Sequence, residues 1–143
     1  MTSVAIHKAH IEEHLHAIDG AIAVGVEQRP ATIGLHVSAG AISLLELYLH
    51  VLDKITIGSM IKHEWFKEPK PEQKIAPLAE RKIPVEFPAK EELFSLMYII
   101  EERRNKLIYG KPSVAAIEEI LKAFQKLHDI IKKKLEERGE SLA

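Results

Sequence analysis

Residues 41–55 of this chain, AISLLELYLHVLDKI, decide its fold. Apolar side chains lie almost all round the helix that this segment would form, and such a helix is expected to be packed on several sides. We therefore predict a central helix that begins after Arg29-Pro30 and continues to about Ile55. Its early part is rich in small residues that would allow a neighbouring helix to approach closely: Gly34, Ser38, Ala39, Gly40 and Ala41.

Three further helices are predicted around this one. The first covers about residues 3–27, with an apolar stripe at Val4, Ile11, Leu15, Ile18 and Ile22. The third starts after Pro88 and ends near residue 109, where Gly110 suits the end of a helix. The fourth follows Ser113, a good N-cap residue, and reaches about residue 138.

Five prolines interrupt residues 65–89, so no long helix can pass through this segment. A connection of this length is either an ordered crossover strapped along the bundle or a functional lid or tether. No segment alternates between apolar and polar residues as a strand does. The prediction is an all-α, four-helix up-and-down bundle of four to five helices, with one long Pro-rich connection and a single domain over residues 1–143.

Composition excludes several classes of function. The chain has 143 residues, no cysteine and a formal net charge of −1. It therefore has no disulfide, no thiolate metal site and no cysteine nucleophile, and it is not a protein that coats nucleic acid indiscriminately. The first residues lack a basic region followed by an apolar core, and the apolar runs are shorter than a membrane span. We expect a soluble, cytoplasmic protein with no membrane partner.

The third predicted helix carries charge where its apolar stripe should continue. Its stripe consists of Leu93, Leu96, Met97, Ile100, Leu107 and Ile108. The spacing calls for another apolar residue at position 103 or 104, but Arg103 and Arg104 stand there. A buried arginine must be hydrogen-bonded or must open onto a cleft, because an unpaired buried charge costs several kcal/mol or more. This segment is therefore the candidate for a functional site.

The sequence offers more than one candidate partner for such an arginine. Glu46, His50 and Asp53 form a polar strip on the central helix, which either neutralises the arginine or is a solvated face. Glu101 lies three residues before Arg104, a spacing that allows an ion pair within one helix. In that second interpretation the arginines merely bridge nearby carboxylates and carbonyl groups.

The string Arg104-Asn105-Lys106-Leu107-Ile108-Tyr109-Gly110, at the end of the third long helix and before a short turn into the last, resembles the signature of the HEPN superfamily. The family pattern is an arginine, then a polar residue that is often asparagine, and a histidine four to six residues beyond the arginine. Here Arg104 and Asn105 match, and Tyr109 stands where the histidine would be.

The resemblance implies a small helical bundle that forms a homodimer, with the two motifs in a shared cleft. Arg104 would contact phosphate, Asn105 would orient it, and Tyr109 would occupy the acid/base position. Arg103, Lys106 and Lys111 would add contacts to RNA or a nucleotide. No cofactor or metal is implied, and a nucleotidyltransferase is a candidate partner. Active members are metal-independent ribonucleases.

The tyrosine departs from the family pattern in a way that matters for catalysis. A phenol titrates near 10 and is a poor general base at neutral pH, whereas an imidazole is suited to that role. The resemblance therefore predicts a HEPN-like protein that binds RNA or a nucleotide, with ribonuclease activity impaired or lost.

Two alternatives stay open. One is a non-enzymatic helical bundle that serves as a dimer or interaction protein. The other is a metal-binding bundle, because the first helix contains the pairs His7/His10, His10/His14 and Glu13/His16, each with two candidate ligands one turn apart. A di-iron bundle would need a second Glu-x-x-His on another helix, and the sequence contains none.

Overall fold

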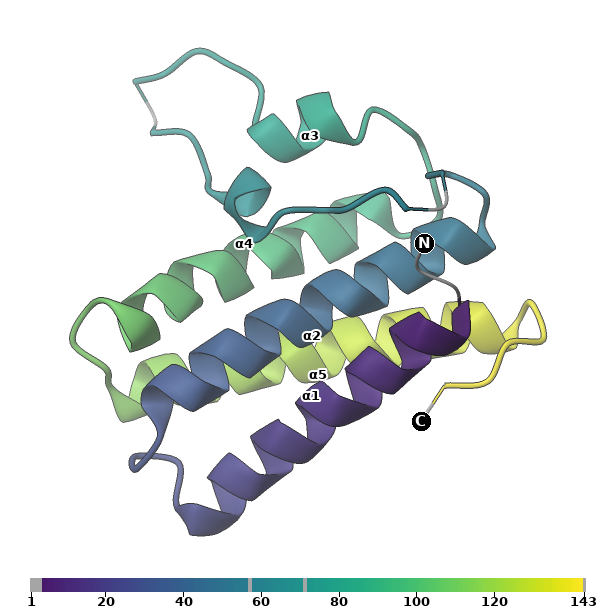
Figure 1. Ribbon diagram of the computed structural model, residues 1–143. Coiled ribbons are helices and arrows are strands. Elements are labelled where there is room, and N and C mark those ends of the chain that lie inside the picture. The colour runs from purple at the N-terminus through teal and green to yellow at the C-terminus, as the bar shows by residue number, and fades with distance from the viewer. Residues whose placement is uncertain (1–3, 57, 71, 143) are drawn as a thin grey trace.

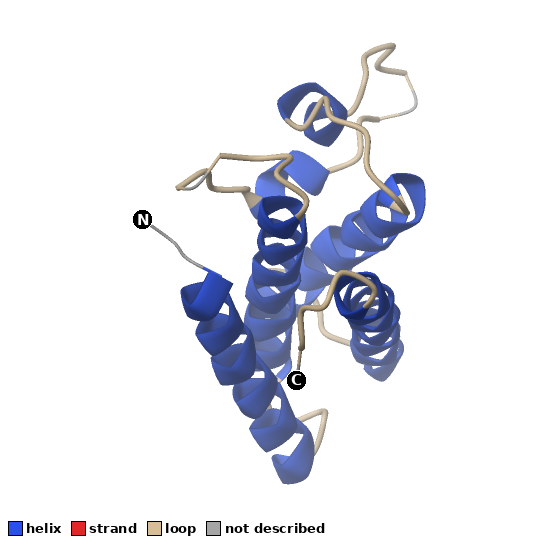
Figure 2. Cartoon of the chain, turned by 90° about the vertical axis from the view of Figure 1, so that its right-hand side faces the viewer, coloured by secondary structure: helices blue, strands red, loops and turns tan. Residues whose placement is uncertain are grey.

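The computed structural model describes residues 4–56, 58–70 and 72–142 (Figure 1). Four long helices, α1 (Val4–Val24), α2 (Pro30–Val51), α4 (Lys90–Ile108) and α5 (Val114–Glu136), run up and down beside one another. The described part contains helices and loops without a strand (Figure 2). The predicted all-α bundle is confirmed.

Helix α2 is the centre of the molecule, as its composition predicts. It packs against α1, α4 and α5, and its buried residues extend round most of its circumference. By its length and composition α2 could cross a membrane, although no membrane-spanning run was predicted from the sequence. Within the bundle, however, 67% of its most apolar 18-residue window is buried. Its apolar character is thus accounted for by packing on several sides.

Two glycines let neighbouring helices approach α2 closely. A Cβ atom added at Gly34 would lie 3.1 Å from Cβ of Leu107 on α4. At Gly40 it would lie 3.3 Å from Cβ of His14 on α1 and 3.4 Å from the ring of Phe124 on α5. The predicted role of the small residues is therefore confirmed at these two positions, where any larger side chain would separate the helices.

Two helix ends come earlier than the sequence predicted. Helix α1 ends at Val24, before Gly25 with a φ of 123°, rather than near residue 27. Helix α2 ends at Val51 rather than near Ile55, because Asp53 takes the left-handed conformation with a φ of 57°. At the start of α5 the prediction is confirmed, since the Ser113 hydroxyl accepts a hydrogen bond from the backbone N–H of Ala116 at 3.1 Å.

The chain between α2 and α4, which ends with the Pro-rich segment 65–89, is packed against the bundle. It contains the 3₁₀-helix η1 (His63–Phe66) and the five-residue helix α3 (Leu78–Lys82), neither of which the sequence predicted. Its anchors in the core are Ile61, Phe66, Ala79, Ile83 and Phe87. Lys90 at the start of α4 is buried and donates to the carbonyl groups of Ile83 at 3.2 Å and Val85 at 2.7 Å. These contacts favour the ordered crossover over a lid or tether.

Because α4 approaches α2 closely at Gly34, substitutions at Gly34 and at Gly20 should differ in their effect on stability. Gly34→Leu should lower the free energy of unfolding by about 1–3 kcal/mol, because the added side chain meets Leu107 and the backbone of α4. Gly20→Leu is the matched control, since Gly20 is an exposed residue of α1 with nothing within 4 Å of an added Cβ. Urea denaturation measures both, and equal losses would contradict the packing described.

Candidate functional site: a buried arginine at a cavity

Arg104 lies on the inner face of α4, and its residue surface is only 8% exposed. Its Nη1 donates to Oδ1 of Asn105 at 3.1 Å, while its Nε is buried without a hydrogen-bond partner in the described part of the chain. The ion pairs found among the described residues leave Arg104 without a carboxylate. A buried guanidinium in this state has hydrogen-bond donors left to offer.

Two of the carboxylates that the sequence offered as partners, those of Glu101 and Glu46, are engaged elsewhere. Glu101 is 4% exposed and accepts a hydrogen bond from Nδ1 of His63 at 2.8 Å. Glu46 accepts from the backbone N–H of Ile61 at 2.9 Å, and burial raises the pKa of its carboxyl group. Among the described residues, Glu101 and Glu46 are therefore not the partners of Arg104, because they hold His63 and Ile61, while His50 bonds His7 of α1.

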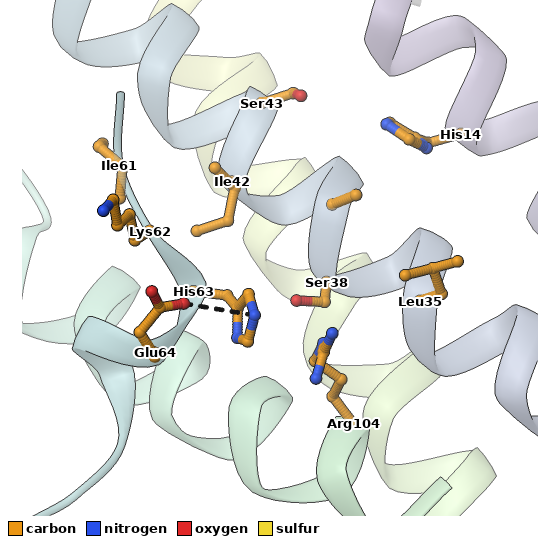
Figure 3. Close-up of a pocket in the computed structure, with 11 residues that line it drawn as sticks. His14, Leu35, Ser38, Ile42, Ser43, Ile61, Lys62, His63, Glu64 and Arg104 are labelled. Atoms are coloured by element: carbon orange, nitrogen blue, oxygen red, sulfur yellow. Dashed lines mark ion pairs between the residues drawn. The ribbon is translucent and has the colours of Figure 1, made fainter. Parts of the chain in front are cut away.

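The guanidinium faces a cavity of about 320 Å³ (Figure 3). Figure 3 shows the side chains of Arg104 and His63 extending into the same space, with Ser38 of α2 facing them. Side chains from α1, α2, η1 with the residues before it, and α4 line this cavity; the polar ones are His14, Ser38, Ser43, Lys62, His63, Glu64 and Arg104. Four segments distant in sequence thus meet at one site.

The charges of this cavity suit an anion. Arg104 and Lys62 carry positive charge, and Glu64 is the single carboxylate among the lining residues. The imidazoles of His14 and His63 also line the cavity, but burial and the charge of His36 lower the pKa of His14, so His14 adds no positive charge near neutral pH. His63 is oriented by the buried Glu101, so its Nε2 lies on the side of the exposed Glu64, 3.4 Å from Oε2 of that residue. A bound phosphate or carboxylate would supply the charge that Arg104 lacks.

The other motif residues do not line this cavity. Asn105, which accepts the hydrogen bond of Arg104, lines a second cavity of about 340 Å³. Tyr109 is 77% exposed at the C-terminal end of α4 and lines neither cavity. Within one chain, the structure therefore brings Arg104 and Asn105 together at adjoining cavities and leaves Tyr109 on the surface.

The three additional cations also lie away from the Arg104 cavity. Arg103 bonds Glu102 at 2.9 Å and, from its Nε, Glu119 of α5 at 2.7 Å, so it joins α4 to α5. These hydrogen bonds and charges raise the pKa of Arg103, with the bond to Glu119 contributing most. Lys106 lies 3.4 Å from Glu102, and Lys111 is exposed after the end of α4. None of the three lines the cavity.

Sequence reasoning missed His63 and Lys62 altogether. They lie just before the Pro-rich segment, where no periodicity fixes the position of a side chain, and Phe66 is the anchor that brings them to α4. The sequence contained one indication of the contact with His63: Glu101 is a carboxylate on the apolar stripe of α4, four residues beyond Met97. A buried carboxylate there required a partner from another element, and His63 supplies it.

The histidines of α1 pair across helices rather than along one helix. His7 Nε2 lies 2.7 Å from His50 Nδ1, and His14 Nδ1 lies 2.9 Å from His36 Nδ1. His50 donates from Nε2 to the carbonyl of Thr56 at 3.0 Å, so its Nδ1 accepts the proton of His7. The described residues contain no group of three or more side chains that could hold a metal ion. The contacts of His7 and His14 join α1 to α2.

Comparison of the chain with models of protein families, with curated proteins and with solved structures finds no match. The resemblance to the HEPN superfamily therefore rests on the motif and on the order of the helices.

The His7–His50 bond predicts that acid weakens the fold. Burial, followed by the charges of His50 and His10, lowers the pKa of His7 to about 4, so unfolding takes up a proton between pH 6.5 and 4. The free energy of unfolding should fall through this window, by up to about 3 kcal/mol from this group. His7→Leu should flatten that slope in urea titrations at successive pH values.

His16→Leu is the control for this experiment, because His16 is an exposed histidine of the same helix. It should keep the pH slope of the parent protein. Equal slopes in the parent and His7→Leu proteins would contradict a buried neutral His7.

Proposed function

We propose that this chain is a HEPN-like protein that binds RNA or a nucleotide through a phosphate group held by Arg104. The observation that carries the proposal is the buried guanidinium of Arg104, which has no carboxylate within the described residues and faces a cavity lined by Lys62 and His63. Arginine presents a planar fork of donors that matches the oxygens of a phosphate. The bound phosphate would complete the charge balance of the site.

In this proposal the motif has no histidine that could take part in catalysis. Tyr109 is an exposed phenol, outside the cavity of Arg104 and outside the second cavity. Ribonuclease activity that depends on the motif is therefore impaired or lost, and any remaining activity would be metal-independent. Binding, rather than turnover, is the activity that Arg104 supports most directly.

The proposal extends to a second copy of the chain. HEPN-like proteins bring two motifs into one cleft, and Leu35, an apolar residue of α2 that is 50% exposed, lies at the rim of the Arg104 cavity. A homodimer that covers this rim would close the cavity against water. We also propose a cytoplasmic setting, in keeping with the cysteine-free composition, and a nucleotidyltransferase as a candidate partner.

A second candidate function is that of an interaction bundle. The observation in its favour is a set of exposed apolar side chains on α1 and α2: Ile6, Ile22, Val24 and Leu35. In that case Arg104 would serve the fold or the dimer, and its loss would weaken stability without changing the binding of any phosphate compound.

The charge at position 104 provides the test. Arg104→Ala should weaken binding of a short single-stranded RNA, or of nucleoside monophosphates, by about tenfold or more, because a charge-assisted hydrogen bond is worth roughly 1.5–3 kcal/mol. Isothermal titration calorimetry measures the affinity, and circular dichroism confirms that the helices are retained.

Arg138→Ala is the matched control, since it removes the same charge from an exposed side chain that lines neither cavity. It should leave the affinity within about twofold of the parent, as expected for a charge outside the site. Equal losses in the two variants, or no binding by the parent protein, would contradict the proposed function.

A further inference from the structure

His63 lines the Arg104 cavity with one of its ring nitrogens already bound. Its Nδ1 donates to Oε1 of Glu101 at 2.8 Å, and the side chain of Glu101 is only 5% exposed. A carboxylate accepts hydrogen bonds and donates none, so Nδ1 carries the proton and Nε2 of the neutral ring keeps its lone pair. Glu101 therefore fixes both the orientation and the tautomer of this imidazole, which prepares Nε2 to accept a proton.

Nε2 lies on the accessible side of the ring. The side chain of His63 is 37% exposed, and Oε2 of Glu64 lies 3.4 Å from Nε2 on a side chain that is 56% exposed. An exposed ion pair of this kind contributes little free energy, so a ligand can displace Glu64. His63 is thus fixed through Nδ1 and open to a ligand at Nε2.

The bond between Glu101 and His63 is not needed to anchor the chain here. Phe66 already does so, because it is 1% exposed and meets the ring of Phe94 edge-on, with the centroids 5.3 Å apart. An apolar residue at position 101 would continue the stripe of α4 without the desolvation cost of a buried carboxylate. The carboxylate at this position therefore calls for a role besides anchoring.

The imidazole of His63 shares its cavity with the guanidinium of Arg104. Both side chains line the cavity, and Figure 3 shows them extending into the same space, with Ser38 facing them. The imidazole can accept a proton, and the guanidinium can stabilise the negative charge that develops on phosphate oxygens. These two functions are what cleavage of a phosphodiester bond requires when the RNA supplies its own nucleophile, the 2′-hydroxyl.

We propose that His63, positioned by Glu101, is the general base of a site that cleaves RNA at the phosphate held by Arg104. The inference rests on the proposed function. It adds a catalytic residue that lies outside the motif of α4 and comes from the 3₁₀-helix η1.

The reaction begins when Nε2 of His63 removes the proton of a ribose 2′-hydroxyl. The 2′-oxygen attacks the adjacent phosphorus, so the bond from O2′ to phosphorus forms while the bond from phosphorus to O5′ of the next nucleotide breaks. Solvent water protonates O5′, and the resulting hydroxide takes the proton of the imidazolium. Arg104 donates hydrogen bonds to the non-bridging oxygens. The products are a 2′,3′-cyclic phosphate and a 5′-hydroxyl.

The experiment compares a short single-stranded RNA of mixed sequence with DNA of the same sequence. The parent protein should cleave the RNA to fragments that end in a 2′,3′-cyclic phosphate, identified by mass spectrometry, and should bind the DNA without cleaving it. His63→Gln should lower the rate constant of cleavage by about a hundredfold or more, as the loss of a general base does. Its affinity for the DNA, measured by calorimetry, should match that of the parent, whereas Arg104→Ala should bind the DNA more weakly.

Two further variants separate proton transfer from folding. Glu101→Gln keeps an acceptor for Nδ1 and removes the charge, so it should slow cleavage by about tenfold or more with the DNA affinity unchanged. Imidazole added to His63→Gly should restore part of the cleavage, which a structural role of His63 would not allow. His16→Gln is the matched control, since His16 is an exposed histidine that does not line the cavity, and it should cleave at the rate of the parent.

The outcomes distinguish this inference from the proposed function. Binding of both strands that depends on Arg104, without cleavage of the RNA, would overturn the inference and leave the proposed function standing. Cleavage that His63→Gln leaves unchanged would overturn it in the same way. No binding of either strand would overturn the proposed function and this inference with it.

Discussion

The buried guanidinium of Arg104 without a carboxylate is the constraint on which the account of this site depends. In the described part of the protein its only hydrogen bond is to Asn105, and its Nε has no partner. A charge in this environment keeps a substantial desolvation cost that no ion pair offsets. The fold carries that cost near the C-terminal end of α4, on a buried face that is mostly apolar and also holds the carboxylate of Glu101. A phosphate in the adjoining cavity would compensate it.

The architecture brings the cavity together around α2. Because α2 is apolar on nearly every side, α1, α4 and α5 all pack on it, and its small residues leave room beside Ser38 and Ser43. The Pro-rich connection then crosses the bundle and inserts Phe66 among the aromatic rings of α4. This anchor carries Lys62 and His63 to the face where Arg104 is buried. The bonds from Lys90 to the carbonyl groups of the connection fix its other end.

The four long helices could be predicted because their signals are local. Apolar residues recur at the helical period, Ser113 caps α5, and prolines exclude a long helix from the connection. The ends of α1 and α2 were predicted too late, because the positive φ angles of Gly25 and Asp53 depend on how the chain turns into the next element. Helix periodicity contains no information about that turn.

The site was predictable only in part, and for a physical reason. The misplaced charge at Arg104 is visible in the sequence, because it interrupts a stripe. Its surroundings depend on which segments meet in space, so His63 was missed and Glu101 was given the wrong partner. Tyr109 is exposed at the C-terminal end of α4, and its place in a cleft shared by two chains stays a prediction. The HEPN resemblance stays a proposal.

The measurement that tests the central claim most directly is the stability of Arg104→Met in the absence of any ligand. Methionine preserves the unbranched apolar stem and removes the charge, so the account predicts a free energy of unfolding, from urea denaturation, equal to that of the parent or higher by about 1–3 kcal/mol. A decrease of about 2 kcal/mol or more would contradict the account, because it would show that the guanidinium of Arg104 stabilises the fold rather than awaiting a ligand.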